Sequence, residues 1–297
     1  MNKITVAIPF YNSLQYFEDA IRMPLLDNRV DEILVCDDCS SEEQYNGLLE
    51  KVESLKSGDQ ISFDVNLSLM NEHHGSCKEV VRLLTSVDAS DNAKKIEVIR
   101  NEINIGGFRN KFHVVSQAKN EWVYLLDSDN FLIESSISAL YNLSEWDETV
   151  CYCPSVPIMQ RKDSWRSWDD WNHRRFGYQP FDLKGIQQFF KIEEEYSRQY
   201  GCGLGVNGFL NTGNFFVNRD RYVNSLQESF DNPNVEPHAA DVVAFSYYWL
   251  INSGKFQIVP DLYYFHRIRD DSFWQRTGMQ AGAASQMYEE KIGRAHV

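Results

Sequence analysis

Two aspartates, Asp127 and Asp129, stand one residue apart at the end of the apolar run in YLLDSDN, residues 124–130. Because side chains of an extended chain alternate with a period of two, both carboxylates project to the same side. Like charges this close repel each other unless a cation lies between them, and carboxylate oxygens suit Mg²⁺ and Mn²⁺. The same residues allow another interpretation, in which Asp129 caps the following helix and Asp127 is solvated. The pair indicates a metal site only if other motifs converge on it.

The segments on either side of this pair alternate between strand and helix patterns. Strands are expected over residues 4–10, 32–36, 95–100 and 122–126, and helices over 14–24, 40–56 and 107–119. This alternation predicts an α/β fold with a Rossmann-like, mainly parallel central sheet flanked by helices. Ligands of such sheets bind beyond the carboxyl ends of the strands, which is where Asp127 and Asp129 stand.

Short local signals set the expected helix boundaries. Asn12 is expected to cap the first helix, and Pro24 to end it. Ser40 and Glu43 form an S-x-x-E capping box that opens the second helix. Residues 57–94 interrupt the alternation as a long insertion, in which the spacing of EVVRLL predicts a further helix.

The second half of the chain elaborates the sheet and carries an aromatic stretch. Helices are expected over 134–143, 182–200 and 242–251, and strands over 150–156, 209–217 and 256–265. Trp165, Trp168 and Trp171 have a three-residue spacing that fits one packed helix face, although such side chains could also stack on sugar rings. A G-x-G-x-x-G match at 203–208 follows a helix and precedes a strand, the reverse of the dinucleotide context, so we do not expect NAD binding.

Charge restricts the classes of partner. The formal net charge is −14, with 43 acidic and 29 basic side chains. This balance argues against nonspecific binding of nucleic acid or anionic membranes. It also means that a phosphate-bearing ligand must be met by a bound cation or by well-placed arginines and lysines. No run of 18 apolar residues predicts a transmembrane segment, and we expect a cytoplasmic protein, with docking to a membrane surface left open.

Three further motifs arrive in a recognisable order: VAIPFYN at 6–12, EILVCDDCSSEE at 32–43, and NEINIGGFRNKFHVVSQAKNEWVYLLDSDN at 101–130. Together they resemble the family 2-like inverting glycosyltransferases with a GT-A fold, whose DXD motif follows the fourth strand. The resemblance implies a nucleotide-sugar-binding half over 1–131 and an acceptor-binding and catalytic half over 132–290. Asn130 and Ala240 depart from the family pattern, because acids are usual at both places. Residues 291–297 resemble the translation of a sequencing-library adapter, and we expect them to be a non-native tail.

The resemblance also implies roles for individual residues on the donor side. Asp38 would accept a hydrogen bond from the uracil or the ribose, and Asp127 would lie near the donor ribose or sugar. Arg109 would reach the diphosphate, unless it is an ordinary exposed helix residue. The full expected nucleotide site consists of Pro9, Tyr11, Asn12, Asp38, Arg109, Asp127 and Arg267.

Metal binding and catalysis are expected to come from three residues. Asp129 and His266 would hold Mn²⁺ or Mg²⁺, with a buried structural histidine as the alternative for His266. Asp241 would be the general base that takes the proton of the acceptor hydroxyl. Its alternative is an ordinary acid favoured by the dipole of a helix N-terminus, and Glu236 is the reserve candidate.

The sequence therefore predicts a metal-dependent glycosyltransferase that moves a sugar from a nucleotide-diphospho-sugar, most simply a UDP-sugar, with inversion. The acceptor would be a glycan, a lipid-linked group or a protein, as in polysaccharide biosynthesis. One alternative is a sugar-nucleotide or glycan binding protein without turnover, motivated by Asn130 and Ala240. Another is a sugar-phosphate nucleotidyltransferase, which the lack of a G-x-G-x-R loop after the first strand disfavours.

Overall fold

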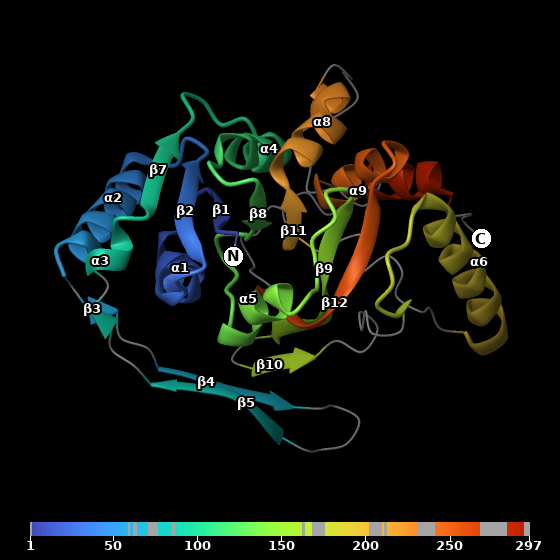
Figure 1. Ribbon diagram of the computed structural model, residues 1–297, viewed down its shortest axis with the longest axis horizontal. Helices are drawn as coiled ribbons and strands as arrows, with labels where there is room; N and C mark the ends of the chain where they lie inside the picture. Colours follow the sequence, from blue (N-terminus) through green and yellow to red (C-terminus); the bar gives the residue numbers. More distant parts are fainter. Residues whose placement is uncertain are drawn as a thin grey trace.

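The computed structural model of the chain describes residues 2–58, 60–61, 64–70, 77–84, 87–88, 90–161, 164–167, 176–201, 210, 213–230, 241–267 and 284–293. Helices lie on both faces of a ten-stranded sheet, with α2 at one end of the molecule and α6 at the other (Figure 1). The predicted α/β class with a central sheet flanked by helices is confirmed.

The first half of the chain builds a parallel sheet in the order β8-β1-β2-β7. These strands are β1 (Ile4–Phe10), β2 (Val30–Asp37), β7 (Ile96–Arg100) and β8 (Trp122–Leu125). Buried apolar residues fill both faces, as expected for strands covered by helices on each side. The carboxyl ends of β1, β2 and β8 therefore meet at one edge, which Asp127 and Asp129 follow directly.

The second half extends this sheet with strands of mixed direction. The short strand β11 (Phe215–Asn218) runs antiparallel beside β8, and the long strands β9 (Val150–Arg161) and β12 (Lys255–Arg267) pair in parallel. Because β11 is antiparallel to β8, its beginning lies beside the end of β8. The carboxyl end of β12 also reaches this place, through a bridge between Phe131 and Phe265.

An antiparallel hairpin completes the far edge of the sheet. Strands β4 (Asp64–Met70) and β5 (Cys77–Leu84) extend along the lower side of the view in Figure 1 and join the sheet through β10 (Ser164–Ser167). A separate two-stranded sheet pairs β3 (Gln60–Ile61) with β6 (Val87–Asp88).

Two apolar cores lie on opposite faces of the sheet. Helices α1 (Phe17–Leu26), α2 (Glu42–Lys56), α3 (Ser90–Ala93) and α5 (Glu134–Tyr141) cover one face. Helices α4 (Gly107–Gln117), α6 (Leu183–Tyr200), α8 (Arg219–Phe230) and α9 (Asp241–Ile251) cover the other. Alternation along β1 shows the division, because Val6 and Ile8 enter the first core and Ala7 enters the second.

Several predicted boundaries were wrong for identifiable reasons. Asn12 caps no helix, since it has a left-handed φ of 46° and bonds to the next loop, and a single 3-10 turn (Leu14–Tyr16) precedes α1. Pro24 lies inside α1, which ends two residues later at Leu26. The cap of α2 is Ser41, one residue beyond the predicted Ser40, and its hydroxyl accepts from Gln44 N.

Two elements were assigned to the wrong class. The EVVRLL stretch forms β5, because its β-branched residues pair with β4. Trp165 lies in β10, and so not on a helix. Helix α8 was not predicted, since its sequence RDRYVNSLQESF is largely polar. Trp168, Trp171, Glu236, Ala240 and the glycine motif at 203–208 lie outside the described residues.

Residues 284–292 form a final helical segment that packs on α6. The side chain of Gln187 donates to the carbonyl of Ile292 at 3.0 Å, and Ile292 is fully buried. The first residues of the predicted non-native tail are therefore part of the packed structure.

Candidate active site

The loop after β8 is held from two neighbouring elements. The backbone N–H of Asp127 donates to Oδ1 of Asn214, which stands just before β11, at 3.0 Å. Asn130 is fully buried and turned inward, where its Oδ1 accepts from the N–H of Arg267 at 3.3 Å. These bonds fix the backbone on both sides of Asp129.

Lys111 on α4 connects two of the predicted site residues. Its ammonium lies 2.9 Å from Oδ1 of Asp127 and 2.7 Å from Oδ2 of Asp241. Since both oxygens lie within 2.9 Å of one nitrogen, the two carboxylates are within about 6 Å of each other. Asp241 is the first residue of α9, so one lysine joins the end of β8, α4 and the start of α9.

Burial gives this cluster unusual electrostatics. The side chains of Lys111, Asp241 and Asp127 are only 12%, 15% and 22% exposed. Burial raises the pKa of Asp127 to about 6, an effect that Lys111 opposes and that Asp129 and Asp241 reinforce. Burial alone would lower the pKa of Lys111, but Asp127 and Asp241 hold it well above its ordinary value. Lys111 is therefore always charged, whereas Asp127 titrates near neutrality.

Gly213 and Tyr264 close the cluster on the β11 and β12 side. A Cβ added at Gly213 would lie 2.3 Å from Oδ2 of Asp127 and 3.3 Å from the hydroxyl of Tyr264. The hydroxyl of Tyr264 also lies 3.1 Å from Nδ1 of His266. Burial raises the pKa of Tyr264, so its hydroxyl keeps its proton. Only glycine fits at position 213 without displacing the carboxylate.

Asp129 and His266 form the predicted metal pair. Burial lowers the pKa of His266 although Asp129 raises it, so the imidazole is neutral at pH 7, as a ligand must be. Within the described part of the chain, no group of three His, Cys, Asp or Glu could hold a metal by itself. A carboxylate and an imidazole still fit Mn²⁺ or Mg²⁺, since Mg²⁺ commonly takes one or two protein carboxylates and completes its shell with water and phosphate.

Comparison with known proteins addresses the fold and the family resemblance. The family model described as Glycosyl transferase family 2 matches residues 76–200. A comparison with curated protein sequences gives no match. The chain is similar to family 2 glycosyltransferases and has the GT-A fold.

Three solved GT-A structures illustrate the likeness. S. aureus TarS 1–349 with UDP-GlcNAc is 14% identical, with a TM-score of 0.53, over 99% of this chain and 68% of that one. GalNAc-T7 with UDP, GalNAc and Mn²⁺ is 13% identical, with a TM-score of 0.53, over 97% of this chain and 50% of that one. The mannosyltransferase PcManGT from Pyrobaculum calidifontis with GDP-Man and Mn²⁺ is 11% identical, with a TM-score of 0.55, over 99% of this chain and 66% of that one. At identities this low, the similarity shows the fold alone. The chain spans about half to two thirds of these proteins' lengths.

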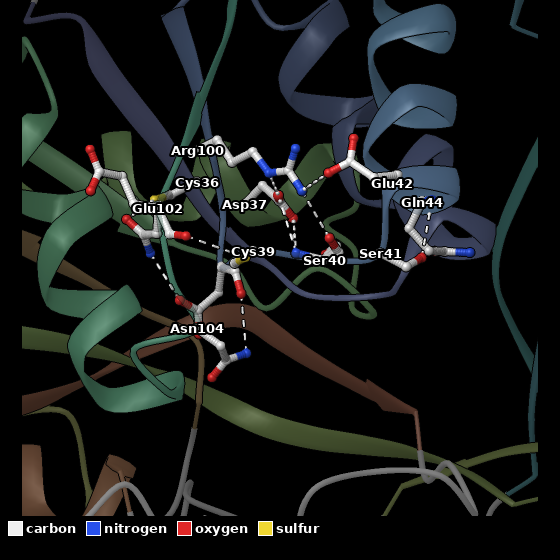
Figure 2. Close-up of polar contacts among 12 residues, drawn as sticks. Cys36, Asp37, Cys39, Ser40, Ser41, Glu42, Gln44, Arg100, Glu102 and Asn104 are labelled. Carbon is white, nitrogen blue, oxygen red and sulfur yellow. Dashed lines mark hydrogen bonds and ion pairs between the residues drawn. The ribbon is translucent and has the colours of Figure 1, made fainter.

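The side chains of Asp37 and Asp38, at the end of β2, point in different directions. Asp37 is fully buried and forms an ion pair with Arg100, which also pairs with Glu42 (Figure 2). The carboxylate of Asp37 also accepts a hydrogen bond from Ser40 N. Asp38 is 2% exposed and turns toward the loop before α4, where Ile105 N and Gly106 N each donate to its carboxylate at 2.9 Å.

This arrangement gives Asp38 a structural part that the sequence did not predict. Asn101 Nδ2 donates a third bond to the same carboxylate at 2.9 Å. With three protein donors on one buried carboxylate, Asp38 fixes the start of α4, and through it the position of Lys111. Its predicted contact with the nucleotide stays a prediction; of these three bonds, two fall on Oδ1 and one on Oδ2, and a carboxylate has about four acceptor sites.

The remaining donor-side residues lie at the end of β1. Pro9 is the penultimate residue of β1 and is half-buried, and Tyr11 is 43% exposed just after the strand. Asn12 is tied to the β2 side, since its N–H donates to Ser40 Oγ at 2.9 Å. An exposed aromatic ring at a strand end is placed as a base-stacking residue would be, and this role remains a prediction.

The two predicted arginines differ in their surroundings. Arg267 stands at the end of β12, where it donates to the carbonyl of Asp129 at 2.8 Å and pairs with Asp19. Arg109 lies over the ring of Phe230, 5.4 Å from its centroid. Two residues are about 200° apart on a helix, so Arg109 faces away from the direction of Lys111.

Sequence reasoning missed Lys111, Gly213 and Tyr264. Lys111 had a usable signal, since it follows Gly107 by four residues and so shares the helix face that approaches Asp241. Gly107 confirms this face, because a Cβ there would lie 3.8 Å from Oδ2 of Asp241. Gly213 and Tyr264 had no such signal, because β11 and β12 bring them to Asp127 from distant parts of the chain.

Proposed function

We propose that this protein is a metal-dependent glycosyltransferase that moves a sugar from a nucleotide-diphospho-sugar to a hydroxyl acceptor with inversion. The observation that carries this proposal is the pair of ion contacts that holds Asp127 and Asp241 on one lysine, at the carboxyl end of the parallel strands. A donor-side carboxylate and a candidate base are thereby within reach of one sugar carbon.

The reaction would be a single displacement. The acceptor oxygen forms a bond to the anomeric carbon while its proton passes to the carboxylate of Asp241. The bond from that carbon to the diphosphate oxygen breaks, and the electron pair leaves with the nucleoside diphosphate. Attack from the side opposite the leaving group inverts the configuration at the anomeric carbon.

Asp129 and His266 would hold the divalent ion. When bound, Mn²⁺ or Mg²⁺ supplies a positive charge for the diphosphate. The contact of His266 Nδ1 with Tyr264 orients the ring and leaves Nε2 for coordination, as is usual for metal-bound histidines. Two of the similar structures, GalNAc-T7 and PcManGT, contain Mn²⁺, which supports the same choice here.

For the donor we propose a UDP-sugar, and for the acceptor a glycan, a lipid-linked group or a protein. TarS and GalNAc-T7 are complexes with UDP-GlcNAc and with UDP, whereas PcManGT holds GDP-Man, so the base must be tested directly. No helix in the described ranges is both long and apolar enough to cross a membrane. We propose a cytoplasmic site of action, with acceptors reached in solution or at a membrane surface.

The test combines a donor screen with a matched pair of variants. Nucleotide release is measured with UDP-, GDP-, dTDP- and CMP-sugars, with and without Mn²⁺, for wild type, Asp241→Asn and Asp220→Asn. Asp220 is the control because it is likewise an acid in the first turn of a helix, α8, but its side chain is 66% exposed and pairs with Arg219 away from the site. We expect metal-dependent release from a UDP-sugar, a loss of at least about 10²-fold for Asp241→Asn, and no loss for Asp220→Asn.

Equal activity of both variants would show that Asp241 is only a helix-terminal acid. Binding without release in wild type would instead favour the inert binding protein. One reason for that alternative was Asn130, which replaces an acid that could bind the metal. Asn130 is buried and accepts a hydrogen bond from Arg267 N, so its side chain has a structural contact in place of a metal ligand's role.

A further inference from the structure

We propose that Lys111 is a positioning residue that orients the carboxylate of Asp241 toward the acceptor by binding it together with Asp127. This inference rests on the proposed function, since it assigns a residue to the same reaction. It concerns the chain's own geometry and requires no particular donor or acceptor.

The first support is the cost of placing Lys111 where it is. An ammonium that is 12% exposed loses most of its hydration, and a buried cation is stable only when it is paired. Lys111 has two carboxylate partners at 2.9 and 2.7 Å. Removing it would leave Asp127 and Asp241 as buried like charges within about 6 Å, which would push their carboxylates apart.

The second support is the rigidity of the helix that carries Lys111. Asp38 binds the backbone at Ile105 and Gly106, just before α4, and Asn110 donates to the carbonyl of Cys36 at 3.0 Å. On the other side, the rings of Phe112 and Phe230 are 4.4 Å apart. The helix is therefore fixed against both β2 and α8, and its lysine enters the site from a set position.

The third support is the specific atom that Lys111 binds. The ammonium contacts Oδ2 of Asp241, so this oxygen is held in the ion pair, and in the proposed reaction Oδ1 is the oxygen that takes the acceptor proton. The same ammonium contacts Oδ1 of Asp127, beside which the donor is proposed to bind. Lys111 thus sets the distance between the base and the donor, on which a displacement depends steeply.

A double-mutant cycle tests this positioning role. Lys111→Met and Asp241→Asn are made singly and together, with Lys111→Arg as the charge-conserving variant and Lys184→Met, an exposed lysine of α6, as the control. We expect Lys111→Met to lower kcat about 10²-fold in the wild-type background and less than about threefold in the Asp241→Asn background. Lys111→Arg should recover part of the loss, and Lys184→Met should match wild type.

The outcomes separate the two proposals. Losses from Lys111→Met that are equal in both backgrounds would show a role independent of Asp241, and would overturn the inference alone. Wild-type kcat in Lys111→Met would do the same. If the wild type has no turnover with any donor, the proposed function fails and the inference fails with it. Melting temperatures identify a variant that does not fold, in which case Lys111→Arg decides the result.

Discussion

Gly213→Ala offers a sharp test of the candidate site, because it adds one methyl group beside one carboxylate. The new Cβ would lie 2.3 Å from Oδ2 of Asp127, whereas ordinary contacts begin near 3.4 Å. The carboxylate must therefore move by about 1 Å. The same Cβ would also lie 3.3 Å from the hydroxyl of Tyr264, and because the backbone fixes the Cβ, the neighbouring side chains must move.

A displacement of this size acts directly on the contact with Lys111. The ion pair of 2.9 Å would lengthen toward the limit of a salt bridge, and the donor-side carboxylate would leave its place beside Asp241. A misplacement of 1 Å near reacting groups costs about 10²-fold in rate, which corresponds to about 2.7 kcal/mol in the barrier. We expect kcat/KM for the donor to fall by this factor.

The assay is initial-rate nucleotide release, with melting temperature measured in parallel. Gly47→Ala is the matched control, because its Cβ would lie 2.4 Å from Cδ2 of Leu14, a methyl group that can rotate away. Unchanged kcat/KM in Gly213→Ala, or an equal loss in Gly47→Ala, would refute the placement of Asp127 in the reaction.

Two further predictions concern individual carboxylates. If Asp127 acts ionised, kcat/KM should fall as the pH drops through about 6. Stability should change in the opposite direction, because the pKa of Asp127 is raised from 3.8 on folding and the folded carboxyl therefore binds more protons than the unfolded one. The free energy of unfolding should decrease by at most about 3 kcal/mol as the pH rises from about 4 to about 6. A flat pH–rate profile between pH 5 and 7 would contradict this. Asp38→Asn should destabilise the fold by about 1–3 kcal/mol in urea unfolding, because an amide cannot accept all the hydrogen bonds that the loop before α4 donates. Unchanged stability together with weaker nucleotide binding would show that Asp38 is a nucleotide contact instead.

The sequence was sufficient for the elements that carry their own periodicity. Strands β1, β2, β7 and β8 and the helices between them have apolar patterns that tertiary packing reinforces. The position of Asp127 and Asp129 after β8 followed from this pattern alone. The hairpin of β4 and β5 failed because a short apolar stretch fits either a helix or a strand until its partner is known.

The composition of the site was harder to predict than the position of the sheet edge. Asp241 could be proposed from family resemblance, but its contact with Lys111 depends on how α4 and α9 cross the sheet. Asp38 was likewise proposed as a nucleotide contact from the family resemblance. Its burial under the loop of Asn101 and Ile105 depends on a connection that no local pattern specifies.

Charge balance explains why a divalent ion belongs in the proposal. Among the residues that the structure describes, the cluster brings three carboxylates, Asp127, Asp129 and Asp241, to the ammonium of Lys111. Arg267 stands nearby, but its pairing with Asp19, which also binds Arg22, offsets part of its charge. A diphosphate approaching this excess of negative charge would be repelled, unless a divalent ion reaches Asp129 and His266 before it. The arms of the donor screen without Mn²⁺ therefore test the electrostatics of the site itself, because Lys111 and Arg267, the cations described here, do not balance its three carboxylates.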